Sequence, residues 1–135
     1  MSSPSKEPRW LTAAVVRALH DESIARFGGS AGVRDEGLLE SALDRPRNLH
    51  GYGSEQRLTM LAAAYGFGIA RNHPFVDGNK RTALISAGAM LEANGYTVAY
   101  TPDDAVHFML SVVNDRLSIE QIVEWLREHS TAAEA

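Results

Sequence analysis

The stretch HPFVDGNKRTAL, residues 73–84, separates the two most apolar segments of the chain. Residues 55–72 before it are apolar on nearly every side after Arg57, and residues 80–93, which begin within it, are largely apolar. Helices with that pattern are usually buried at the centre of a protein. Gly66 and Gly68 lower the helix propensity of the first segment, but they allow a neighbouring helix to pack closely. We therefore predict two central helices joined by this polar stretch.

Residues inside the stretch predict where the two helices end and begin. Pro74 disfavours helical backbone in the residue before it, so we expect the first helix to end there. Asp77 and Gly78 are typical of a turn. Asn79 is a preferred N-cap residue, and we expect it to cap the second helix. A polar loop is thus expected beside the buried centre of the protein.

Four outer helices are predicted as well, over residues 10–27, 35–45 and 103–113 and after a capping box of Ser118 and Gln121. Pro46 is expected to end the second of these helices. YTVAY, residues 96–100, is β-branched and predicts an extended linker or at most one strand. The fold class that follows is all-α, a compact bundle of six helices.

The length of 135 residues is enough for one domain with a single core. We expect that domain at residues 10–129, with flexible tails at residues 1–9 and 130–135. No cysteine is present, which excludes a disulfide framework, a zinc–thiolate site and a thiol nucleophile. A net charge of −4 argues against direct nucleic-acid binding. No apolar run is long enough to span a membrane. A cytoplasmic protein is the expectation.

Lys80 and Arg81 stand at the start of the second central helix, where a cation is unfavourable. A helix N-terminus carries a partial positive charge and prefers Asp or Glu in its first turn. Two cations there destabilise the empty helix, but with its free N–H groups they form a strong site for a highly charged anion. A phosphate chain fits, because arginine offers forked hydrogen bonds and lysine a point charge.

Asp77 and His73 add two groups that the cations cannot supply. A carboxylate beside a phosphate chain is repulsive unless a hard cation such as Mg²⁺ lies between them. His73 can take a proton from an incoming hydroxyl. Arg71, two residues earlier, is a further candidate for phosphate contact. Each feature alone is compatible with a plain turn and solvated cations, but their convergence in one short loop favours phosphoryl or nucleotidyl transfer.

The same stretch resembles the Fic superfamily motif, His-Pro-Phe-x-Asp/Glu-Gly-Asn-Gly-Arg-x-x-Arg. The matching residues are His73, Pro74, Phe75, Asp77, Gly78, Asn79 and Arg81. Lys80 replaces the second glycine and Leu84 the last arginine, and GNKRTAL is the usual form of the Doc (death-on-curing) branch. LHDESIARFGG and LEANGY are also similar to Doc-type proteins, so the resemblance covers about residues 10–128.

The resemblance implies a compact all-α fold that uses ATP and Mg²⁺. It implies that His73 is the general base, Asp77 the metal ligand and Phe75 a buried anchor for the loop. The residues that it implies for holding the phosphates are Gly78, Asn79, Lys80 and Arg81.

Lys80 and Leu84 bear on the type of transfer. Typical Fic enzymes transfer AMP and use the second glycine and the last arginine to place the β- and γ-phosphates. Doc-like proteins bind the nucleotide in the reverse sense and transfer the γ-phosphate, and their target is a threonine of translation elongation factor Tu. The resemblance thus implies a toxin kinase that arrests translation. The alternatives are a Fic-type adenylyltransferase and a catalytically idle binding module, against which the pair of His73 and Asp77 speaks.

Fic proteins are often restrained by an inhibitory helix with the pattern Ser/Thr-x-x-x-Glu-Gly/Asn. The glutamate that precedes a glycine here is Glu36, and Gly32 occupies the position of the required hydroxyl residue. A toxic enzyme without such a helix needs a separate inhibitor. The resemblance implies an antitoxin of the "prevents host death" type, whose C-terminal segment would bind as a helix in a groove.

His20 and Asp21 resemble the histidine–aspartate pair of metal phosphohydrolases. That site needs further ligands, and none stands at a suitable spacing. We interpret His20 and Asp21 as a pair on a helix surface.

Overall fold

A computed structural model describes residues 7–53, 55, 57–111 and 117–132 of the chain. Six helices and two short strands occur in this part, which confirms the mostly helical fold. Their bounds are α1 Ala13–Phe27, α2 Glu36–Gly51, α3 Leu58–Asn72, α4 Asn79–Ala93, β1 Tyr96–Val98, α5 Pro102–Ser111, α6 Ile119–His129 and β2 Ser130–Ala132.

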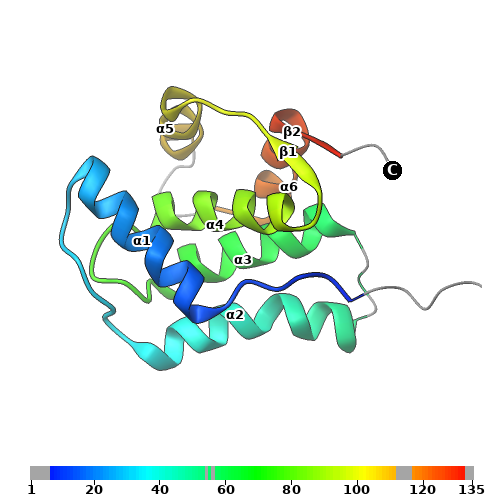
Figure 1. Cartoon of the computed structure of the whole chain (residues 1–135), viewed down its shortest axis with the longest axis horizontal. Coiled ribbons are helices and arrows are strands. Elements are labelled where there is room, and N and C mark those ends of the chain that lie inside the picture. Colours follow the sequence, from blue (N-terminus) through cyan, green and yellow to red (C-terminus); the bar gives the residue numbers. More distant parts are fainter. Residues whose placement is uncertain (1–6, 54, 56, 112–116, 133–135) are drawn as a thin grey trace, which may run out of the picture.

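Helix α3 is the centre of the fold and lies between α2 and α4 (Figure 1). Glycines on α3 permit both contacts, as the sequence predicts. A Cβ on Gly66 would lie 3.1 Å from the Ala83 carbonyl oxygen of α4, and one on Gly68 would lie 3.1 Å from the Ala42 Cα of α2. The backbones of three helices therefore approach more closely than larger side chains would allow.

Helices α1, α5 and α6 complete the bundle around this centre (Figure 1). Helix α6 covers α3 with four buried residues, Ile122, Val123, Trp125 and Leu126. Its predicted capping box is confirmed, since Ser118 Oγ accepts from the Gln121 N–H and Gln121 Oε1 accepts from the Ser118 N–H. Helix α5 has no fully buried residue and lies beside the two cavities described below.

The two strands form a small antiparallel sheet that ties the end of the chain to the segment after α4. Tyr96 pairs with Ala132 and Val98 with Ser130. The predicted single strand therefore has a partner in residues 130–132, which the sequence analysis assigned to a flexible tail. Residues 133–135, and residues 1–6 of the tail predicted at residues 1–9, lie outside the described residues.

Three predicted helix bounds are wrong, and one of them is the start of α3, which begins at Leu58 rather than residue 55. Helix α2 does not end at Pro46 but continues to Gly51, with Pro46 buried inside it. Proline lacks the N–H that would bond to the carbonyl of Ala42, yet burial of its ring against the core offsets the loss. Helix α1 begins at Ala13 rather than residue 10, because Thr12 caps it by accepting from the Val15 N–H.

Within the described part of the chain, none of the helices has the length and the apolar character that crossing a membrane requires.

We predict that Gly68→Ala lowers the free energy of unfolding by about 1–3 kcal/mol, because its Cβ would overlap the backbone of α2. Gly51→Ala is the matched control, since Gly51 is also helical and a Cβ there meets nothing within 4 Å. Urea unfolding of both variants checks the prediction. Equal stability of the two would show that α2 and α3 can separate without cost.

Candidate active site

The loop between α3 and α4, residues 73–78, is built from backbone conformations that stop one helix and start the next. His73 has a left-handed conformation with φ 50° and ψ 54°, and its N–H closes α3 on the Ile69 carbonyl. Gly78 is also left-handed, with φ 72°, and precedes α4. Only glycine adopts this region at little cost, whereas a residue such as His73 is held there by its surroundings.

Asn79 fixes the loop by bonding to both backbone groups of Phe75. Its Oδ1 accepts from the Phe75 N–H and its Nδ2 donates to the Phe75 carbonyl, each at 3.0 Å. The predicted N-cap role of Asn79 is therefore wrong: Gly78 is the N-cap, and the Asn79 side chain points back into the loop. Phe75 is 1% exposed, as expected for a buried anchor.

A second segment, residues 28–35 after α1, runs alongside the loop and bonds to its backbone. Val33 and Phe75 form an antiparallel bridge, and the Val76 N–H donates to the Gly32 carbonyl at 3.0 Å. Arg34 adds side-chain donors: its Nε and one terminal nitrogen donate to the carbonyls of His73 at 2.8 Å and Asn72 at 3.0 Å. These carbonyls belong to the end of α3, where a cation is favourable.

Asp77 has an exposed carboxylate that accepts two backbone hydrogen bonds. The Ser30 N–H donates to Oδ2 at 3.2 Å and the Gly78 N–H to Oδ1 at 2.9 Å. These two hydrogen bonds lower the pKa of Asp77 from its ordinary value, and the bond from Ser30 has the largest effect. The charge of Arg81 lowers the pKa further. The carboxylate is consequently ionised at neutral pH.

Most of the predicted site residues line one open groove, which we call the motif groove and whose volume is about 390 Å³. The residues that line it are His73, Val76, Asp77, Gly78, Asn79, Lys80, Arg81 and Met109. The His73 and Asp77 side chains are exposed, and those of Lys80 and Arg81 are half-buried. The predicted base, carboxylate and cations are therefore brought together on one surface, and Met109 of α5 adds an apolar side chain that the sequence analysis missed.

Arg71 is not among the residues that line this groove. Its guanidinium carbon lies 5.9 Å from the ring centroid of Phe67, one turn earlier on α3. A contact between Arg71 and a nucleotide stays a prediction.

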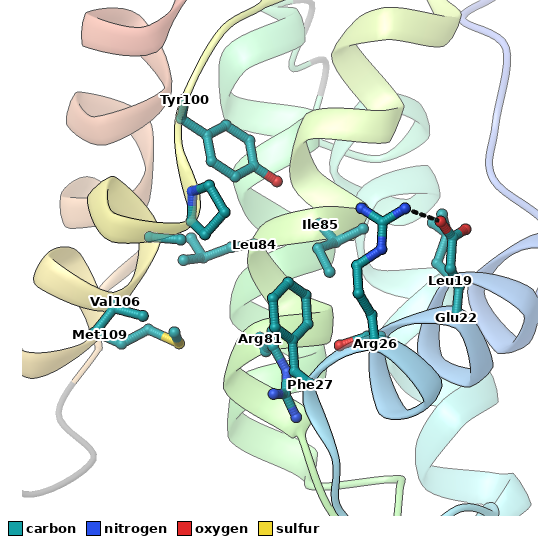
Figure 2. A pocket seen from close by; sticks show the side chains of 13 residues that line it. Leu19, Glu22, Arg26, Phe27, Arg81, Leu84, Ile85, Tyr100, Val106 and Met109 are labelled. Atoms are coloured by element: carbon teal, nitrogen blue, oxygen red, sulfur yellow. Dashed lines mark ion pairs between the residues drawn. The ribbon is translucent and has the colours of Figure 1, made fainter.

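Arg81 lies between the motif groove and a second cavity of about 460 Å³, which we call the apolar pocket. The pocket is bounded by α1, α4 and α5, and its lining residues include Leu19, Phe27, Leu84, Ile85, Tyr100, Val106 and Met109 (Figure 2). The Arg81 guanidinium lies over the Phe27 ring at 5.2 Å and donates to the Gly28 carbonyl at 3.2 Å. Its Nε is buried and has no hydrogen-bond partner among the described residues.

Leu84, the residue at the position of the last arginine in the Fic motif, is 2% exposed. It lines the apolar pocket and not the motif groove. A charged side chain at this position would have to enter an apolar environment, which costs several kcal/mol for an unpaired ion by a rough estimate.

His20 contacts the motif loop, which sequence analysis missed, and the prediction that it lies on a helix surface is wrong. It is 1% exposed, and its Nε2 lies 2.7 Å from the Asp77 carbonyl oxygen. The signal that could have revealed it is spacing: Val16, His20 and Ser23 recur at helical intervals, and all three are buried on α1.

The residues present fit Mg²⁺ bound together with a nucleotide better than Mg²⁺ held by the protein alone. Among the described residues, no three His, Cys, Asp or Glu side chains form a cluster that suits a metal ion. Mg²⁺ commonly uses one or two carboxylates, with phosphates and waters as the other ligands. Each carboxylate oxygen of Asp77 accepts one backbone hydrogen bond and has further lone pairs, so Asp77 would hold the ion. The phosphates would be held by Lys80, Arg81 and the first N–H groups of α4.

Comparison with known proteins gives the same picture. Residues 10–91 match the Fic/DOC family. The chain is 35% identical over 117 residues to "Protein kinase doc" of Escherichia phage P1, which covers 87% of this chain and 92% of that protein. It is 39% identical over 111 residues to "Toxin Doc" of Mycolicibacterium smegmatis, covering 80% of this chain and 85% of that protein. The chain is thus homologous over most of its length to a protein whose name describes it as a protein kinase. This confirms the expectation that the chain is a Doc-like kinase. The chain belongs to the Fic/DOC family, as a member of its Doc branch.

Proposed function

We propose that the chain is the toxin of a toxin–antitoxin system and acts as an ATP-dependent protein kinase. It transfers the γ-phosphate of ATP, with Mg²⁺, to a threonine of translation elongation factor Tu and so arrests translation. The observation that carries the proposal is the motif groove, in which a base, an ionised carboxylate and two cations at a helix N-terminus share one surface. Phosphoryl transfer needs this combination, because it depends on positioning and on charge stabilisation.

The chemistry follows from the placement of the side chains. A neutral His73 ring nitrogen takes the proton of the threonine hydroxyl, and the hydroxyl oxygen bonds to the γ-phosphorus. The bond between that phosphorus and the oxygen that bridges it to the β-phosphate breaks, and ADP leaves. The side chains of Lys80 and Arg81, together with the first N–H groups of α4, stabilise the charge on the phosphate oxygens.

Leu84 favours γ-phosphate transfer over AMP transfer. In the Fic motif an arginine at this position contacts the phosphates, whereas here a buried leucine faces the apolar pocket. Lys80 of the motif groove supplies a cation where the Fic motif has open backbone. The phosphates therefore have a different set of positive partners from that of an AMP-transferring Fic enzyme.

The apolar pocket fits the partner that a toxin requires. A groove between helices accepts the apolar face of an amphipathic helix, and this pocket combines exposed apolar side chains, such as Phe27 and Val106, with the charged pair Glu22 and Arg26. We propose that the C-terminal segment of a "prevents host death" antitoxin binds there.

The first prediction from the proposed function concerns His73. Incubation of elongation factor Tu with the protein, ATP and Mg²⁺ should add one phosphate to its intact mass, and His73→Asn should lower the rate about 10²–10⁴-fold. Asparagine suits the test because it tolerates the left-handed conformation of His73 but cannot act as a base. Addition of AMP instead would identify an adenylyltransferase, and a His73→Asn variant with the wild-type rate would exclude His73 as the base. No added mass would exclude elongation factor Tu as the substrate.

The second prediction concerns the Asp77 carboxylate. A Cβ on Gly29 would lie 2.7 Å from Asp77 Oδ2, so Gly29→Ala should displace the carboxylate and weaken binding of Mg²⁺–ATP about tenfold or more. Gly28→Ala is the matched control, since it also has a positive φ but nothing within 4 Å of its Cβ. Calorimetric titration with Mg²⁺ and a non-hydrolysable ATP analogue measures both. The same loss in both variants would assign the effect to backbone strain instead.

The third prediction concerns the apolar pocket. Val106→Asp should weaken binding of an antitoxin C-terminal peptide at least about tenfold, because the carboxylate would be buried without a partner, and it should leave phosphate transfer unchanged. Val15→Asp is the control, since Val15 is 43% exposed, close to the 48% of Val106, but does not line the pocket. Fluorescence anisotropy of the labelled peptide measures the affinity. Equal binding by the two variants would place the antitoxin elsewhere.

A further inference from the structure

His20 of α1 lies directly beneath the motif loop. Its ring is stacked on that of Phe75, with centroids 3.9 Å apart and an angle of 9° between the planes. Its Nε2 lies 2.7 Å from the backbone carbonyl oxygen of Asp77. The side chain is 1% exposed, so water does not compete for either contact. A buried polar side chain without such a partner would cost about 1–3 kcal/mol.

The chemistry of this contact determines which atom is the hydrogen-bond donor. A carbonyl oxygen can only accept a hydrogen bond, so Nε2 of His20 carries the hydrogen and donates it. Asp21, the next residue in the sequence, has its Oδ1 3.9 Å from Nδ1 of His20, and its side chain is 72% exposed. The short contact of His20 is therefore made to the loop and not to its neighbour on α1.

The peptide that His20 holds is the one that joins Asp77 to Gly78. On one side of this peptide is the carboxylate, which is separately held by the N–H groups of Ser30 and Gly78. On the other side α4 begins, at the left-handed Gly78. The orientation of this one peptide thus sets the direction of the carboxylate and of the first N–H groups of α4.

We propose that His20 is a positioning residue for phosphoryl transfer, which fixes the Asp77–Gly78 peptide in the orientation that the nucleotide site requires. The proposal deepens the proposed function and rests on it. A loop that is already ordered when Mg²⁺–ATP arrives does not lose conformational freedom on binding, and it keeps the phosphates within the small range of positions that catalysis tolerates. His20 touches neither substrate nor metal and acts through Asp77.

The alternative is that His20 only fills the core between α1 and the loop. Two amide side chains separate the alternatives. The amide nitrogen of glutamine is the same number of bonds from Cα as Nε2 of histidine, so His20→Gln can still donate to the Asp77 carbonyl. His20→Asn is one bond shorter and cannot reach it, while both variants lose the aromatic stack on Phe75 equally.

The experiment compares the wild type, His20→Asn and His20→Gln. For each protein it measures the hydrogen–deuterium exchange of residues 73–81 and the steady-state kinetics of phosphate transfer. His20→Asn should exchange faster in this loop, raise KM for Mg²⁺–ATP and lower kcat/KM by about 10–100-fold, since a misplacement of roughly 1 Å has effects of that size. His20→Gln should stay within about threefold of the wild type in kcat/KM, as expected for a retained hydrogen bond.

Val16→Ala is the control for a general loss of stability, because Val16 is buried one turn earlier on α1. It should lower the melting temperature without changing loop exchange or kcat/KM of the folded protein. If His20→Asn and His20→Gln have the same loop exchange, or if Val16→Ala reproduces the effects of His20→Asn, the positioning role is excluded. Loop exchange does not depend on activity, so a wild-type protein that transfers no phosphate would overturn the proposed function and leave this test intact.

Discussion

The paired hydrogen bonds between the Asn79 side chain and the backbone of Phe75 are the contact on which the site depends. They lie at 3.0 Å each in a region where Phe75 is 1% and Asn79 8% exposed. Buried backbone groups outside regular structure must find partners, or the loop would cost more than the bundle could offset. The Asn79 amide supplies both partners and so allows an irregular, polar loop to lie between the two buried helices.

The start of α4 shows a conflict between stability and binding. Its first turn contains no acidic residue, and two cations, Lys80 and Arg81, stand where the helix dipole disfavours them. An isolated helix would gain stability from Asp or Glu there. Local rules broken without a structural gain are expected at functional sites, and a bound phosphate chain would turn the unfavourable charges into favourable ones.

The sequence predicts much of the fold because the apolar pattern and the glycines of α3 act locally. Prediction from the sequence fails where the contact that determines the structure joins residues that are distant in the sequence. Pro46 should end α2, but contact with the core keeps the helix intact, and residues 130–132 form a strand only because residues 96–98 lie beside them. His20 belongs to the same class, since its partner Asp77 is 57 residues away.

The candidate site likewise has parts that could be predicted from local sequence and parts that depend on distant contacts. Except for Met109, the residues of the motif groove lie within residues 73–81, so their grouping could be predicted. The predicted N-cap role of Asn79 is wrong because local propensity does not reveal that its amide is needed by Phe75. Arg81 has the least predictable setting, since it contacts Phe27 at the end of α1 and Gly28 just after it, and it lines both cavities. The terminal nitrogen that donates to the Gly28 carbonyl keeps a second N–H, which can donate to a phosphate in the motif groove. Under the proposed function, a partner segment in the apolar pocket and a nucleotide in the motif groove therefore act on one side chain, and each would change the affinity of the protein for the other.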